Sequence, residues 1–228
     1  MLQRWRVDDG HKVSEPVRTE TGNIYVLALS PDRRWLAFGF DRGALCVVWD
    51  AQTRQKVLDI YGHTRHVMSV DVSPASTKFA TGAYDRLAFI WSLATGDRLL
   101  GPLRHSAEVT AVRFSPDGDR LATATTQFIT IYNSDNGHLV LVIPCSFHRH
   151  SATPLVWSAD GCQLFTASNG EVKRFGTSSG ALLSKWSTIG GPGVTSIVLS
   201  SNSRFAVVIA QWALSFWDHY REANWYCY

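Results

Sequence analysis

The chain has 228 residues, a formal net charge of +3, and 45% hydrophobic and 12% aromatic residues. This composition can build a substantial core in a single globular domain. The small net charge and the scattered lysines and arginines disfavour a nucleic-acid-binding protein, and no apolar run reaches the ~18 residues that a membrane-spanning helix needs.

Cysteine use and the N-terminal sequence indicate an intracellular protein. The four cysteines form no C-x-x-C pair, and no N-x-S/T acceptor site occurs. Charged residues interrupt the first ten positions, where a secretory signal would need an apolar stretch. We therefore expect reduced thiols and a cytoplasmic or nuclear location.

A similar segment occurs five times, at residues 29–39, 72–82, 114–124, 157–167 and 199–209. Its serines are spaced by 43, 42, 43 and 42 residues, and are Ser30, Ser73, Ser115, Ser158 and Ser200. An aromatic residue follows each at a similar distance: Trp49, Trp91, Tyr132, Phe175 and Trp217. A period of this length, with several short strands in each unit, predicts a radial array of β-sheets, because one unit cannot bury its own apolar face.

The predicted elements begin with two strands at residues 2–7 and 11–17, so that the chain starts halfway through a unit. The clearest full unit has strands at 66–72, 78–83, 87–91 and 98–100, separated by Ser-Pro, Tyr-Asp-Arg and Thr-Gly turns. Residues 225–228 could supply a closing strand. No segment has a sustained 3.6-residue apolar period, so we expect almost no helix.

Gly62-His63, Trp49-Asp50 and Trp217-Asp218 carry a further resemblance. The chain is similar to the WD40-repeat β-propeller family, especially its fungal and bacterial arrays. This family has Gly-His near the start of a blade and Trp-Asp at the end of the third strand. The resemblance implies an all-β propeller in one domain, residues 1–228. Its predicted parts are a half-blade at 1–22 and four-stranded blades at 23–65, 66–107, 108–150, 151–192 and 193–228.

The resemblance also implies a buried network of His, Ser/Thr, Asp and Trp within each blade. In the second repeat it assigns His63, Asp85 and Trp91, with Ala83 where the hydroxyl is expected; Trp49 and Trp217 are the corresponding core residues of the first and fifth repeats. Other repeats depart further, with Glu20, Gln127, Tyr132, His148, Ser168, Phe175 and Gln211 near network positions. The prediction is that no repeat has the complete network.

Two interpretations of blade number follow. In a closed five-bladed ring, strand 11–17 would complete the fifth blade. In a part of a longer propeller, blades would be missing, and the exposed sheet edges would favour self-association. Because seven blades are common in the family, the second interpretation is favoured.

Two motifs suggest other chemistry. Residues 176–180 read G-x-S-x-G, but they occupy a hairpin-turn position, whereas a hydrolase nucleophile needs a strand–turn–helix context. Cys145, His148 and His150 lie close in sequence, but a structural zinc site needs a fourth ligand. We therefore predict no catalytic residues, cofactor or metal.

The predicted function is a non-enzymatic scaffold that docks a protein or peptide partner. By resemblance, partner contacts lie beside the first strand of each blade and between its second and third strands. The positions are Asn23, Tyr25, His66, Met68, Tyr84, Arg86, Glu108 and Thr110. The alternatives are a propeller enzyme with its site in the central mouth and a nucleic-acid-binding module.

Overall fold

The computed structural model describes residues 3, 5–16, 24–40, 45–147, 153–168, 170–187, 194–203, 205–210, 213–218 and 221–227. For residues 45, 168, 195 and those after 204 it describes the backbone alone. Within these ranges the chain forms twenty β-strands in five sheets, and no helix there is long and apolar enough to cross a membrane.

Each sheet is a blade of four consecutive antiparallel strands. The first and second blades consist of β1 (Ile24–Leu29), β2 (Trp35–Phe40), β3 (Leu45–Asp50) and β4 (Lys56–Tyr61), then β5 (Val67–Val72), β6 (Lys78–Ala83), β7 (Leu87–Ser92) and β8 (Arg98–Arg104). The third and fourth consist of β9 (Ala111–Phe114), β10 (Arg120–Ala124), β11 (Phe128–Asn133) and β12 (Leu139–Pro144), then β13 (Leu155–Trp157), β14 (Gln163–Ser168), β15 (Glu171–Gly176) and β16 (Leu182–Ser187). The fifth consists of β17 (Val194–Leu199), β18 (Phe205–Ala210), β19 (Ala213–Asp218) and β20 (Arg221–Cys227).

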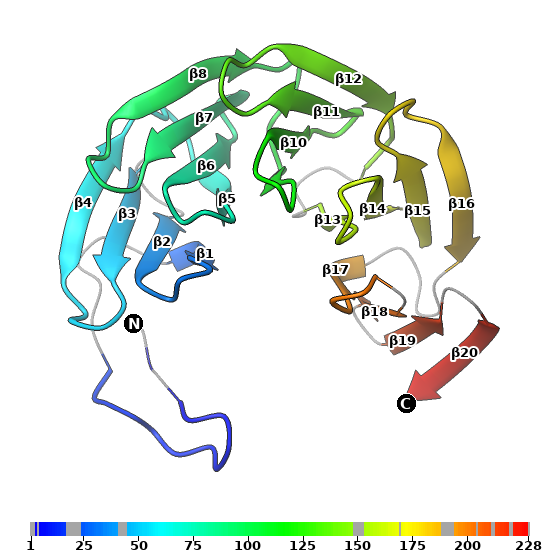
Figure 1. Ribbon diagram of the computed structural model, residues 1–228, viewed down its shortest axis with the longest axis horizontal. Coiled ribbons are helices and arrows are strands. Elements are labelled where there is room, and N and C mark those ends of the chain that lie inside the picture. Colours follow the sequence, from blue (N-terminus) through cyan, green and yellow to red (C-terminus); the bar gives the residue numbers. More distant parts are fainter. Residues whose placement is uncertain are drawn as a thin grey trace.

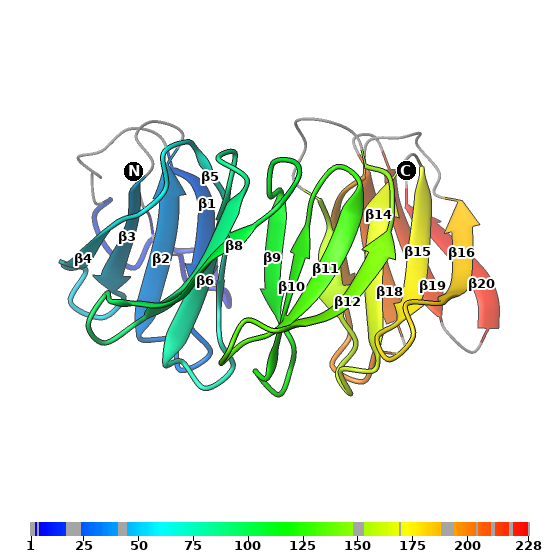
Figure 2. The same cartoon turned by 90° about the horizontal axis from the view of Figure 1, so that it is seen from above.

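The five blades follow one another around an arc that is open between the first and the fifth blade (Figure 1). The first strand of each blade lies on the inner side of the arc, and the fourth lies on the outer side. The strands run between two faces of the arc, which Figure 2 shows edge on. We call the face with residues 62–66, 84–86 and 105–110 the loop face. The opposite strand ends, with residues 30–34, 73–77 and 115–119, form the turn face.

The hydrophobic core lies between neighbouring blades. One cluster joins Val48 and Ile60 of the first blade to Phe79, Phe89 and Trp91 of the second. Other clusters join the second blade to the third, the third to the fourth and the fourth to the fifth. Each of the first four blades therefore packs apolar side chains against the next one, as the repeat predicted.

Hydrogen bonds on the turn face strengthen the contact between blades. The Lys78 ammonium group donates to Ser134 Oγ at 2.9 Å and forms an ion pair with Asp135 at 2.6 Å. Arg120 Nη2 donates to the Gly161 carbonyl at 2.9 Å. The repeated serine has a local role, because its hydroxyl accepts from the backbone N–H that starts the second strand, as Ser30 does from Trp35 at 2.8 Å. This bond closes the tight turn between the first two strands.

The described N-terminal residues do not take the place that the five-bladed interpretation gave them. Residues 11–16 add no strand to the fifth blade, whose fourth strand is β20, from the C-terminal tail. Within residues 5–16 there is one isolated bridge, Trp5 to Lys12, around a turn at 7–9, in place of the two predicted strands. A strand that follows β19 after two residues pairs with it at a smaller loop-closure cost than a strand some 200 residues away.

Candidate functional site

A buried hydrogen-bond network connects the second blade to the loop that precedes it. Trp91 Nε1 lies 2.8 Å from Thr81 Oγ1, which lies 2.7 Å from His63 Nε2, while His63 Nδ1 lies 2.9 Å from Asp85 Oδ2. An indole N–H can only donate and a carboxylate only accepts. The donors therefore run from Trp91 through Thr81 to His63, and from His63 to Asp85. Trp91 is 4% exposed.

This network corrects the prediction that the second repeat lacks its hydroxyl. Thr81 supplies it, two residues before Ala83, on the same face of β6. The sequence contained a signal for this position: Thr81, Thr123 and Thr166 each follow their repeat's serine by eight residues. The second repeat therefore has all four members of the network.

Asp85 also holds the backbone around this network. Its carboxylate accepts from the backbone N–H of Thr64 at 2.8 Å and of Leu87 at 3.1 Å. Burial alone would raise the pKa of Asp85, but the hydrogen bonds from His63 and Thr64 bring the pKa below its ordinary value. Asp85 is therefore charged at neutral pH, and it fixes the turn at 84–86 to the loop at 62–66.

The third blade has a reduced version of the network. His105 Nε2 lies 2.8 Å from Thr123 Oγ1. Tyr132 replaces tryptophan, and its hydroxyl makes a longer contact with His105 Nε2, at 3.4 Å. His105 Nδ1 lies 3.1 Å from the carbonyl of Leu103, and Gln127 is exposed. In the first and fourth blades, Trp49 and Phe175 are core residues. Glu20, His148 and Gln211 lie outside the described residues, as do the side chains of Ser168 and Trp217.

Part of the predicted partner surface comes together on the loop face. The rings of His66 and Tyr84 lie 6.0 Å apart, and the Tyr84 N–H donates to the His66 carbonyl at 3.0 Å. Burial raises the pKa of the Tyr84 hydroxyl, and the nearby Tyr25 and Glu108 raise this pKa further. Arg86 is exposed, and its backbone has a φ of 69° in the same turn.

Two predicted contact residues do not belong to this surface. Met68 is 3% exposed and Thr110 is 2% exposed, so blade packing does not leave them free for a partner. Thr110 Oγ1 instead lies 2.7 Å from Thr153 Oγ1 of the neighbouring blade. Inner-strand side chains are covered because the next blade packs on them. Asn23 lies outside the described residues. We call the remaining five residues the loop-face cluster: Tyr25, His66, Tyr84, Arg86 and Glu108.

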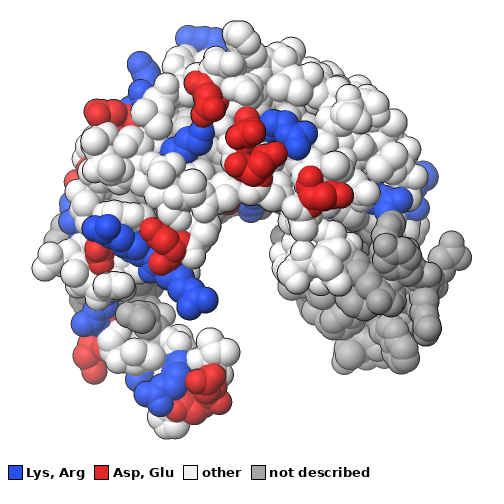
Figure 3. Space-filling model, in the orientation of Figure 1, with Lys and Arg blue, Asp and Glu red and all other residues white. Residues whose placement is uncertain are grey.

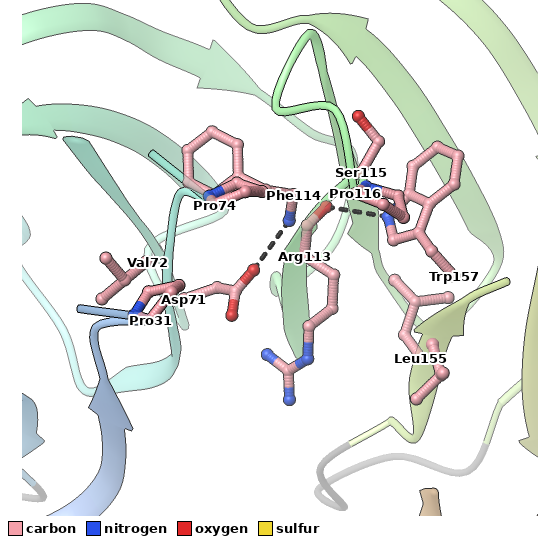
Figure 4. A pocket seen from close by; sticks show the side chains of 11 residues that line it. Pro31, Asp71, Val72, Pro74, Arg113, Phe114, Ser115, Pro116, Leu155 and Trp157 are labelled. Carbon is pink, nitrogen blue, oxygen red and sulfur yellow. Dashed lines mark hydrogen bonds between the residues drawn. The ribbon is translucent and has the colours of Figure 1, made fainter. Parts of the chain in front are cut away.

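A pocket of about 380 Å³, which the sequence interpretation missed, opens on the inner side of the arc near the turn face (Figure 4). Its wall is largely apolar, with prolines from three turns and Trp157. Asp71 accepts from the Phe114 N–H at 2.7 Å, and Arg113 donates to Ser69 Oγ at 3.1 Å. Burial raises the pKa of Asp71 to about 6, although the Arg113 guanidinium opposes the rise. The sequence signals for this site were the aspartate in an inner strand and the proline that follows the serine in three of the repeats.

The G-x-S-x-G motif is part of the fold. Residues 176–180 form the hairpin turn between β15 and β16, closed by the Gly180 N–H donating to the Gly176 carbonyl at 2.9 Å. Ser178 is exposed in that turn. Cys145 is buried, whereas His148 and His150 lie outside the described ranges. The part of the chain that the structure describes has no group of three metal-ligating side chains.

Comparisons with known proteins agree with this geometry. The family model "WD domain, G-beta repeat" matches residues 54–92 and 98–140. No curated protein sequence matches the chain. Among solved structures, the β-propeller domain of Cps50 (Swd1) from Myceliophteria thermophila is similar, with a TM-score of 0.76 and 18% identity over 88% of this chain and 67% of that one. At this identity the similarity concerns the fold. Residues 54–92 and 98–140 are thus WD40 repeats, and the chain folds as a WD40-type β-propeller.

Proposed function

We propose that this chain is a non-enzymatic docking module, and that it binds a protein or peptide partner through the loop-face cluster. WD40 propellers commonly act as scaffolds for protein partners. The observation that supports this particular surface is the arrangement of Tyr84 against His66, with Tyr25 and Glu108 beside it. Tyrosine and arginine are the residue types on which binding energy concentrates in protein interfaces.

The cluster is supported by a backbone that is held in place. The turn at 84–86 is bonded on one side by Tyr84 to His66 and on the other by the His105 N–H, which donates to the Arg86 carbonyl at 3.0 Å. Beneath it, Asp85 takes part in the buried network. A preorganised surface loses less conformational entropy on binding, which favours affinity.

Substitution of the cluster tests the proposal. Tyr84→Ala and Arg86→Ala should each weaken a validated partner by more than about 1 kcal/mol, as hot-spot truncations do. Suitable controls lie elsewhere on the molecule. Arg54 is an exposed arginine with a φ of 60° on the turn face, and Tyr61 is an exposed tyrosine of β4. Arg54→Ala and Tyr61→Ala should leave affinity unchanged in a titration calorimetry series.

Full affinity in both cluster variants would exclude this surface. The proposal that the chain is not an enzyme fails if the purified protein turns over a substrate and the rate is lost in Ser178→Ala or His148→Ala.

The nucleic-acid alternative has less support. On the turn face, acidic and basic side chains are interspersed (Figure 3), whereas phosphate binding requires clustered positive charge. A salt titration separates the two functions: the affinity for a nucleic acid would fall steeply with salt, and we expect any such binding here to be weak.

A further inference from the structure

A second, smaller pocket lies in the third blade, on the outer part of the sheet. Its volume is about 200 Å³. It is lined by residues of β8, β11, β12 and the adjoining loops: Arg104, His105, Ser106, Thr125, Phe128, Thr130, Tyr132, Leu139 and Val142. It is separate from the loop-face cluster, and no residue is shared between them.

The second blade explains why the third has this pocket. Phe89 pairs with Thr81 across the second blade, and its ring lies 4.8 Å from that of His63 and 5.1 Å from that of Trp91. In the third blade, Thr130 pairs with Thr123 at the same position. Tyr132 likewise stands where the second blade has Trp91. Threonine and tyrosine thus replace phenylalanine and tryptophan, and space remains beside the histidine.

The residue before the histidine changes together with them. In the second blade it is Gly62, where an added Cβ would lie 2.4 Å from the Trp91 ring. In the third blade it is Arg104, which the shorter Tyr132 allows. The same three positions are filled in the second blade and leave space in the third, where Arg104 lines the pocket.

The lining combines one positive charge with hydroxyl groups and an apolar edge. Arg104 forms no ion pair with any residue that the structure describes. Burial lowers the pKa of His105 and raises the pKa of Tyr132, so both are neutral at pH 7. Leu139 and Val142 are 60% and 44% exposed, which makes the edge on β12 apolar and accessible. The pocket therefore favours a ligand with a negative charge and a small aliphatic body.

We propose that this pocket binds a small branched aliphatic carboxylate, with the carboxylate on Arg104 and the hydrocarbon part against Leu139 and Val142. A guanidinium group forms charge-assisted, often bidentate, hydrogen bonds with a carboxylate. The volume is below the 300–1,000 Å³ range of sites for drug-sized ligands, so the site accommodates one side-chain-sized group. Such a group occurs as a free acid or as the C-terminal residue of a peptide.

The test uses three probes on the full chain, with binding followed by protein-detected NMR at millimolar ligand. The probes are 4-methylpentanoate, the corresponding neutral amide, and N-acetyl-leucine as a mimic of a peptide C-terminus. Both carboxylates should shift resonances of the third blade, and the amide should bind about tenfold more weakly, because it lacks the charge-assisted bond. Tighter binding of N-acetyl-leucine identifies a peptide C-terminus as the source, and tighter binding of 4-methylpentanoate identifies a free acid.

Two variants make the test specific. Arg104→Gly restores the residue of the second blade and should weaken the carboxylates about tenfold. Thr130→Phe refills the space and should abolish binding without loss of stability; Arg104→Gly provides the same test if Thr130→Phe does not fold. Arg54→Ala is the control for a lost surface charge. Equal binding of acid and amide, or unchanged binding in Arg104→Gly, would overturn the proposal.

Discussion

The second and third blades share strand order but differ at the hydrogen-bond network beside their histidines. In the second blade, Trp91, Thr81, His63 and Asp85 form a closed chain of donors and acceptors. In the third blade, His105 keeps its threonine but turns its other nitrogen to a backbone carbonyl. Both blades fold because each packs buried apolar side chains against a neighbouring blade. The network is therefore an addition to the packing, and where it is reduced, the chain has space for a different site.

The largest expected effect distinguishes the aromatic residues of the two networks. Trp91→Ala should cost roughly 3–5 kcal/mol in the free energy of unfolding, since it removes a large buried side chain from the core between blades. Tyr132→Ala should cost clearly less, because Tyr132 is only partly buried beside a cavity. Urea unfolding of both variants measures the difference. Equal costs would mean that the two blades are packed equally well.

The next effect concerns the close contact between Gly62 and Trp91. Gly62→Ala should cost about 1–3 kcal/mol, because its Cβ would overlap the indole ring and the ring would have to move. In a Trp91→Tyr background, which resembles the third blade, the cost should be largely relieved. A double-mutant cycle gives the coupling energy, and additive costs would show that the pair is not responsible for the difference between blades.

The hydroxyl at the centre of each network has a somewhat smaller effect. Thr81→Val leaves the Trp91 N–H and His63 Nε2 without their partner and should cost about 1–3 kcal/mol. Thr123→Val removes the contact with His105 at 2.8 Å and the bond that Thr123 donates to the Thr130 carbonyl at 3.2 Å. It should cost less, because no buried indole N–H loses its acceptor. Ala83→Ser is the control, since a hydroxyl there should not rescue Thr81→Val. Thermal or urea unfolding measures all three, and rescue by Ala83→Ser would contradict the assignment of Thr81.

The smallest expected effect is a dependence on pH that the network of the second blade has and that of the third blade lacks, because His63 is bonded to a carboxylate and His105 to a backbone carbonyl. The pKa of Asp85 is lower in the folded protein, so its stabilising contribution is present above the unfolded pKa, near 3.9, and is lost as the pH falls through the folded value. Burial opposes the hydrogen bonds, so this contribution should be smaller than the costs above. The Asp85→Asn variant should lack this pH-dependent contribution. The network of the third blade, which has Gln127 near the corresponding position, should lack it as well. Unfolding free energies measured from pH 3 to pH 7 check this, and parallel curves for the two proteins would contradict it.

Most of the secondary structure followed from local features of the sequence. The predicted strands 66–72 and 78–83 agree with β5 and β6 within one residue, because strand alternation and turn-forming residues act over short distances. The spacing of the serines determined the repeat, and the Gly62-His63 and Trp-Asp pairs indicated the family. His63, Asp85 and Trp91 were assigned from the same pattern, and they lie in one network.

Other features depended on residues that are distant in sequence. Thr81 and Ala83 share one face of β6, so only the distance to His63 shows which one enters the network. Met68 and Thr110 have the sequence position of surface residues, but neighbouring inner strands cover them. The pocket of the third blade requires Arg104 of β8 to meet Thr130 and Tyr132 of β11. The sequence by itself determined where strands and turns form, because these depend on neighbouring residues. Only the tertiary structure decided which side chains are buried, bonded or free, because this depends on how one blade packs against the next.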